Sequence, residues 1–180
     1  MAPINLLALS GSLRSTSYNT AAIEALKALA PPHITIQIGS INELPLFNPD
    51  LDELAIPALV NLRDAIKRSD GLIIASPEYA HGVSGPMKNA LDWLVSSFEF
   101  PYKPIMLINT SPRASHAQAS LVEILTTMSG VIVDQAYTSI PLLGSDLDAN
   151  GILEDGELVR ALKDGLDAFY LAITSIERTD

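Results

Sequence analysis

The sequence has no cysteine, which excludes a disulfide framework, a thiolate zinc site, an iron–sulfur cluster and a cysteine nucleophile. It also has no apolar run that approaches the ~20 residues a membrane-spanning helix needs. No basic segment leads into a hydrophobic stretch near the first residue, so we expect no secretory signal. These absences predict a cytoplasmic protein without a membrane partner.

Positive charge is scarce in this chain. The 11 lysine and arginine residues face 21 aspartate and glutamate residues, which gives a formal net charge of −10. A surface of this sign repels the phosphates of nucleic acids, so we expect no nucleic-acid partner. Within residues 1–40, however, Arg14 and Lys27 stand against Glu24 alone. That segment should therefore repel an anionic ligand less than the acidic remainder of the chain does.

Motifs for metal or hydrolytic chemistry are missing as well. The three histidines, His33, His81 and His116, do not have the spacing of a metal-ligand motif. A serine hydrolase with a nucleophile elbow would need a G-x-S-x-G sequence, and none occurs. We therefore predict no metal site and assign no catalytic side chain.

What the sequence does contain is a regular alternation of apolar runs and amphipathic stretches. A length of 180 residues corresponds to one domain at ~150 residues each, so we expect a single domain over residues 1–180. Near-continuous apolar runs predict strands covered on both faces, the alternation of isoleucine with polar residues at 34–38 predicts an edge strand, and apolar residues at helical spacing predict helices. The predicted strands are 4–9, 34–38, 71–75, 105–108 and 131–133, and the predicted helices are 18–30, 57–69, 86–95, 114–128 and 157–176.

This alternation predicts an α/β fold in which a five-stranded parallel sheet lies between two layers of helices. Five such strands favour the order 2-1-3-4-5, which places the switch point between the first and third strands. Ligands of these sheets bind outside the carboxyl ends of the strands, near the switch point. The loops that follow Leu9, Ala75 and Ile108 are therefore expected to meet around one ligand.

The loop after the first strand has the features of a phosphate site. It leads into a helix whose first-turn amides lack intrahelical partners and carry partial positive charge. Ser12, Ser17 and Asn19 add short hydrogen-bonding side chains, and Arg14 adds a fixed positive charge. The alternative is an ordinary polar loop in which Ser17 is only the N-cap of the helix.

The loop after residues 71–75 is rich in proline and glycine. Its P-E-Y tripeptide at 77–79, followed by K-N-A-L-D-W at 88–93, resembles the NADPH-dependent FMN reductases, a flavodoxin-like family that includes azobenzene, quinone and chromate reductases. The first loop agrees, because S-L-R-S-T-S-Y-N at 12–19 fits that family's S-x-R-x-x-S-x-N phosphate loop. The resemblance runs from Ile4 to about Val133.

The resemblance implies a flavodoxin-like three-layer sandwich that binds FMN and uses NADPH or NADH as co-substrate. It implies reduction of a small-molecule acceptor, such as a flavin, quinone or azo compound, by ping-pong hydride transfer through FMN. It also implies a homodimer or a dimer of dimers. The residues implied to contact FMN are Ser12, Leu13, Arg14, Ser17, Tyr18 and Asn19 in the first loop, Pro77, Glu78, Tyr79 and Ala80 in the second, and Ser111 in the third.

Several positions leave alternatives open. Many members of the family carry Asn where this chain has Ala80 and Pro where it has Ser84. Arg113 either meets a nucleotide phosphate or is a solvated charge. Trp93 and Phe98 belong either to the core or to a subunit interface. The alternative function is a non-catalytic, flavodoxin-type electron carrier.

The segment 146–157 fits the twelve-residue EF-hand loop at every oxygen position, with Gly151 sixth and Glu157 twelfth. The helix that should precede such a loop is missing, because residues 140–144 are predicted to be extended. An acidic loop of this kind also precedes the last helix in many flavodoxin-like reductases. Calcium binding and a purely structural loop are both left open.

Overall fold

The computed structural model describes residues 1–51, 55–111, 113 and 115–176. Its centre is a parallel sheet in the order β2-β1-β3-β6-β7, and β8 also pairs with β6. The predicted α/β class and strand order are confirmed, with the difference that two short strands share the fifth position. The 3-10 turn η2 (Asp134–Ala136) separates them. The strands are β1 (Ile4–Ser10), β2 (Ile34–Gly39), β3 (Gly71–Ala75), β6 (Pro104–Asn109), β7 (Val131–Ile132) and β8 (Thr138–Ser139).

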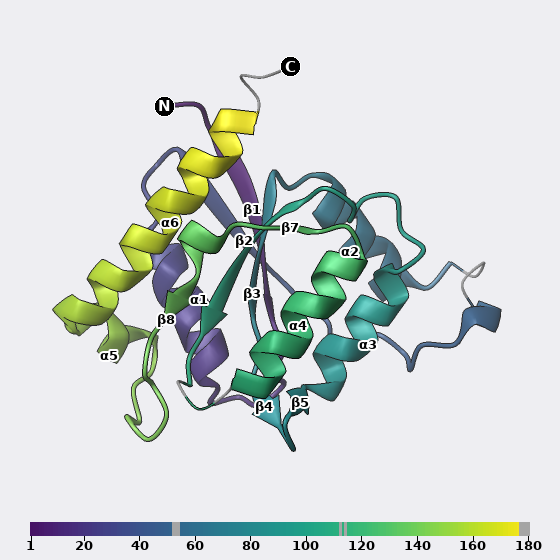
Figure 1. Ribbon diagram of the computed structural model, residues 1–180, viewed down its shortest axis with the longest axis horizontal. Helices are drawn as coiled ribbons and strands as arrows, with labels where there is room; N and C mark the ends of the chain where they lie inside the picture. The colour runs from purple at the N-terminus through teal and green to yellow at the C-terminus, as the bar shows by residue number, and fades with distance from the viewer. Residues whose placement is uncertain (52–54, 112, 114, 177–180) are drawn as a thin grey trace.

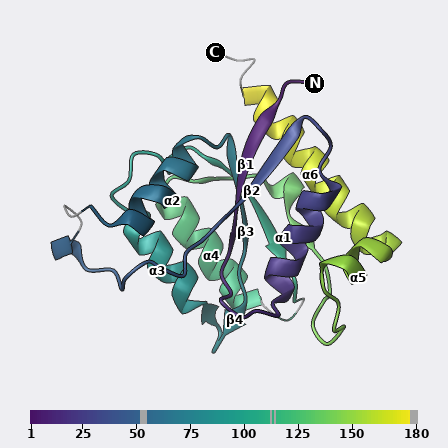
Figure 2. The ribbon, with the colours of Figure 1, turned by 180° about the vertical axis from the view of Figure 1, so that it is seen from behind.

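Helices cover both faces of the sheet. Figure 1 and Figure 2 show α1, α5 and α6 on one side and α2, α3 and α4 on the other. The five predicted helices are present, whereas the short α5 and the 3-10 turn η1 (Pro49–Leu51) were not predicted. Among the described residues, no helix is both long and apolar enough to cross a membrane. The helices are α1 (Tyr18–Leu29), α2 (Pro57–Lys67), α3 (Gly85–Leu94), α4 (Ser115–Thr127), α5 (Ala149–Glu154) and α6 (Gly156–Ile176).

Successive side chains of the central strands enter two separate cores. In β1, Ile4, Leu6 and Ala8 pack in the core formed with α1 and α6, and Leu7 and Leu9 pack in the core formed with α2, α3 and α4. All five side chains are buried. Because both faces of the sheet are covered, the strand shows no polar alternation, and this is why its sequence predicted a central strand.

A two-stranded hairpin outside the main sheet was not predicted. Its strands are β4 (Glu78–Tyr79) and β5 (Gly82–Val83), which pair antiparallel. Ala80 and His81 form the turn with φ angles of 49° and 61°. A two-residue turn of this kind needs positive φ at both central positions. Asn, which many family members carry in place of Ala80, tolerates that conformation better than alanine.

The segment that matches an EF-hand does not fold as one. Asp148 caps α5 and accepts the backbone N–H of Gly151 at 2.9 Å. Asp155 accepts the N–H groups of Glu157 and Leu158 at the start of α6. These carboxylates each serve a helix end instead of surrounding one ion. In the part of the chain that the structure describes, no three or more His, Asp or Glu side chains are placed to hold a metal ion.

Candidate functional site

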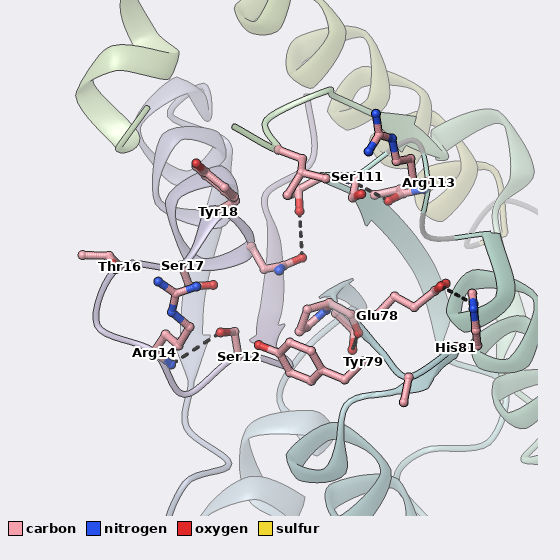
Figure 3. Close-up of a pocket in the computed structure, with 17 residues that line it drawn as sticks. Ser12, Arg14, Thr16, Ser17, Tyr18, Glu78, Tyr79, His81, Ser111 and Arg113 are labelled. Atoms are coloured by element: carbon pink, nitrogen blue, oxygen red, sulfur yellow. Dashed lines mark hydrogen bonds and ion pairs between the residues drawn. The ribbon is translucent and has the colours of Figure 1, made fainter. Parts of the chain in front are cut away.

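A cavity of about 380 Å³ lies at the carboxyl ends of β1, β3 and β6, where the three predicted loops meet (Figure 3). This volume is within the range of small-molecule sites. Ten of the eleven residues implied to contact FMN line the cavity. They are Ser12, Arg14, Ser17, Tyr18, Asn19, Pro77, Glu78, Tyr79, Ala80 and Ser111.

Leu13 is the one residue of that set that does not line the cavity, and it is 54% exposed. The cavity wall also contains Thr16, Ser76, His81, Asn109, Thr110, Arg113 and Leu143. Asn109 and Thr110 end β6 and follow it directly, so the topology alone could have placed them here. Leu143 comes from the chain after β8, where no local pattern signals a binding residue.

The first loop brings the N-terminus of α1 to the cavity. Ser17 is the N-cap, and its side chain accepts the N–H of Thr20 at 3.4 Å. The first turn of α1 contains no acidic residue, so no side chain of its own neutralises the positive end of the helix. Ser12 and Arg14, in the loop before this turn, line the same cavity (Figure 3). Ser17 is the N-cap of α1, and this role is compatible with an anion at the same helix end.

Buried serines join the first and second loops. The Ser84 hydroxyl donates to the carbonyl of Gly11 at 2.6 Å and accepts the N–H of Met87 as the N-cap of α3. Ser76 Oγ lies 3.4 Å from Ser84 Oγ. A Cβ atom at position 11 would lie 2.5 Å from Ser76 Oγ, so this close approach requires glycine.

A side-chain hydrogen bond joins the first and third loops. The Thr110 hydroxyl donates to Asn19 Oδ1 at 3.2 Å, and both side chains are buried. Asn109 Oδ1 accepts the N–H of Ser111 at 3.0 Å, and its amide donates to the Tyr137 hydroxyl. The oxygen of Asn19 is thus engaged inside the protein, at a residue that also lines the cavity.

The Glu78 carboxylate joins the second and third loops. Oε2 accepts the N–H of Ala117 in the first turn of α4 at 2.8 Å, and Oε1 lies 3.1 Å from His81 Nδ1. The hydrogen bond from Ala117 lowers the pKa of Glu78, and the bond and charge of His81 act in the same direction. The Glu78 side chain therefore has a structural role, while its backbone lies along the cavity.

Comparison of the sequence with known protein families identifies the family to which this chain belongs. A model of the family described as NADPH-dependent FMN reductase matches residues 4–142. The chain belongs to the NADPH-dependent FMN reductase family. It is an oxidoreductase that works with FMN and with NAD(P)H as co-substrate, so the enzyme prediction is confirmed and the electron-carrier alternative is disfavoured.

Two relatives of this FMN reductase family member align with it over most of its length. An NAD(P)H-dependent FMN reductase of Pseudomonas aeruginosa is 33% identical over 174 residues, which cover 93% of this chain and 94% of the relative. A 2-hydroxy-1,4-benzoquinone reductase of a Burkholderia species is 31% identical over 165 residues, which cover 88% and 90%. The solved structure of FerB, a flavoenzyme NAD(P)H:(acceptor) oxidoreductase of Paracoccus denitrificans, superposes with a TM-score of 0.78 at 27% identity and covers 96% of this chain and 98% of its own.

The residues of this reductase fit FMN in the cavity. A phosphate needs donors and positive charge, and the site offers Arg14, hydroxyl groups and an unneutralised helix N-terminus. A flat ring needs an apolar or aromatic surface, and Tyr79 lines the cavity with 53% of its surface exposed. Arg14 and Arg113 lie on opposite sides of the cavity in Figure 3.

The buried Ser84 side chain is expected to stabilise the junction of the first two loops. The variant S84A loses a helix N-cap and leaves the Gly11 carbonyl without its donor, which should cost about 2 kcal/mol of unfolding free energy. Urea denaturation of the apoprotein measures this loss. The matched variant S17A removes only an N-cap and should cost about 1 kcal/mol. Equal losses in both variants would contradict a special role for the Ser84–Gly11 bond.

Proposed function

We propose that the first loop holds the FMN phosphate through Ser12, Arg14, Ser17 and Asn19, together with the first-turn amides of α1. The support is that these four side chains line the cavity, that Thr110 fixes the Asn19 side chain, and that the first turn of α1 contains no acidic residue. Tyr18 borders the same region, and its hydroxyl accepts the N–H of Asp146 at 3.1 Å. Leu13 is placed outside the cavity and is not included in this proposal.

The second and third loops would hold the flavin ring. Residues 77–80 run along the cavity in the β4–β5 hairpin, and Ser111 faces them from the third loop in Figure 3. When bound, FMN supplies the hydride-transfer chemistry. The chain contributes orientation, backbone donors and exclusion of water, and no side-chain nucleophile is needed.

The observation that carries the function is that all three loops border one cavity. NAD(P)H and the acceptor would use this same space in turn, so NAD(P)H would leave before the acceptor enters. This arrangement gives ping-pong turnover. The acceptors of the proposal are quinones, azo compounds and free flavins, which share a flat shape that can lie against the ring.

Steady-state kinetics with NADPH and 1,4-benzoquinone test this function on the FMN-loaded protein. Reciprocal plots of rate against NADPH at several fixed quinone concentrations should be parallel, because the two substrates exchange at one site. Intersecting lines would contradict the shared site. Flavin binding without NADPH oxidation would instead identify an electron carrier.

The phosphate assignment predicts a specific effect of Arg14. The variant R14A should bind FMN about 10- to 100-fold more weakly, because a hydrogen bond to a charged group contributes about 1.5–3 kcal/mol. Its affinity for riboflavin, which has no phosphate, should be unchanged. Quenching of flavin fluorescence measures both dissociation constants.

The control for this experiment is R160A, in which an exposed arginine of α6 is removed. It should bind FMN and riboflavin as the parent protein does. If R14A weakens both flavins equally, or weakens neither, the phosphate does not lie beside Arg14.

We also propose that the chain forms a homodimer or a dimer of dimers through the end of α3. Val95, Phe98 and Tyr102 are exposed there, Phe98 at 96%, whereas Trp93 belongs to the core and donates its Nε1–H to the Pro45 carbonyl at 2.8 Å. Exposed apolar groups gathered in one segment are typical of interaction surfaces.

Sedimentation measures this assembly. The parent protein should sediment as a dimer or tetramer, and F98S should shift it toward the monomer. The matched variant L171S, which changes an exposed leucine of α6 on the opposite helical layer, should leave the assembly intact. A monomeric parent protein would refute the proposal.

A further inference from the structure

The proposed quinone reduction consumes a proton as well as a hydride. The sum is NAD(P)H + H⁺ + quinone → NAD(P)⁺ + hydroquinone, and the proton must reach a quinone oxygen inside the cavity. A donor placed in the wall can accelerate such a step, typically by 10²- to 10⁴-fold.

Few side chains of the cavity wall are suited to the task. The wall carries the guanidinium groups of Arg14 and Arg113 and the phenols of Tyr18 and Tyr79, whereas histidine is the side chain that most often transfers protons in enzymes. Glu78 has a lowered pKa and is held as a carboxylate by the N–H of Ala117. Among the described residues that line the cavity, this leaves His81, whose imidazole is the side chain suited to proton transfer near neutrality.

The geometry around His81 is that of an oriented imidazole. Its Nδ1 lies 3.1 Å from Glu78 Oε1, and the other carboxylate oxygen is fixed by the first turn of α4. A carboxylate on Nδ1 sets the ring orientation and leaves Nε2 as the group that exchanges a proton with a substrate. The ring also meets His116 edge-on, with centroids 4.5 Å apart.

The backbone of His81 is itself held in an uncommon conformation. Its φ angle is 61°, which is costly for a non-glycine residue and persists only when surrounding structure imposes it. The β4–β5 pairing and the Glu78 contact impose it here. The His81 side chain remains 75% exposed, so solvent can return a proton to it after each turnover.

We propose that His81 is the proton donor for reduction of quinone-type acceptors, acting from Nε2 while Glu78 holds Nδ1. With bound FMN supplying the hydride chemistry, the quinone would gain a hydride at one carbonyl oxygen, and negative charge would develop on the oxygen at the other end. The Nε2–H bond of the imidazolium breaks and an O–H bond forms at that oxygen. The imidazole becomes neutral and takes a proton from solvent. This inference rests on the proposed function.

Glu78 on β4 and His116 on α4 contact His81, and Arg113, which precedes α4, lines the same cavity. In this proposal the imidazolium form donates the proton, so the rate of quinone reduction should fall as the pH is raised. The variant H81N should lose this pH dependence.

The test uses FMN-loaded protein that has been reduced with NADPH and is then mixed rapidly with an acceptor. With 1,4-benzoquinone, H81N should react at least about tenfold more slowly than the parent protein. With ferricyanide, which accepts electrons without a proton, H81N and the parent should react at the same rate. Asparagine tolerates positive φ, so the turn is retained in this variant. The control H33Q changes a histidine at the amino end of β2, far from the cavity, and should match the parent with both acceptors.

A second measurement does not depend on turnover. The imidazole proton resonances of the oxidised, FMN-loaded protein are recorded by NMR while hydroquinone is added, with His81 assigned by its loss in H81N. The His81 resonance should shift with hydroquinone, and the His33 resonance should not.

The outcomes distinguish the role of His81 from the proposed reductase function. Three results would each overturn the role of His81 while leaving the reductase function intact. They are equal slowing of H81N with quinone and ferricyanide, an unchanged rate of H81N with quinone, and a His81 resonance that does not shift with hydroquinone. Failure of the parent protein to bind FMN or to be reduced by NADPH would overturn both.

Discussion

The site depends on pairwise hydrogen bonds between three loops that are far apart in the sequence. Parallel strands bring the loops to one edge of the sheet, and the bonds then fix their spacing before any ligand arrives. Each pair of loops is joined by its own hydrogen bond, so the position of each loop does not depend on the sheet alone. The three bonds are Ser84 Oγ to the Gly11 carbonyl, Thr110 Oγ1 to Asn19 Oδ1, and the Ala117 N–H to the Glu78 carboxylate.

The local distribution of charge explains how an acidic protein could bind an anionic cofactor. The formal net charge of −10 opposes a phosphate, so the favourable terms must be local. In the proposed site Arg14 and the N-terminus of α1 would supply them at one end of the cavity, while the Glu78 carboxylate accepts the N–H of Ala117 at the N-terminus of α4. The carboxylate thereby offsets the positive end of α4, which would direct an anion to the N-terminus of α1.

The sequence predicted most of the architecture because the buried runs and amphipathic stretches are regular. It predicted which loops meet, because the carboxyl ends of parallel strands share one edge. It missed the β4–β5 hairpin, since Ala80 and His81 are not residues that signal a turn with positive φ. It also missed α5, because the acidic pattern at 146–157 suits helix caps as well as an ion. The bonds of Ser84 and Glu78 are tertiary, and no local pattern could show them.

A crystal structure of the protein grown with FMN tests the central claim most directly. We expect the phosphate within hydrogen-bonding distance of Arg14 and the first-turn amides of α1, with the ring along Tyr79 and the three inter-loop bonds unchanged. A flavin bound elsewhere, or loops that separate and rearrange to admit it, would contradict the account of a preformed site.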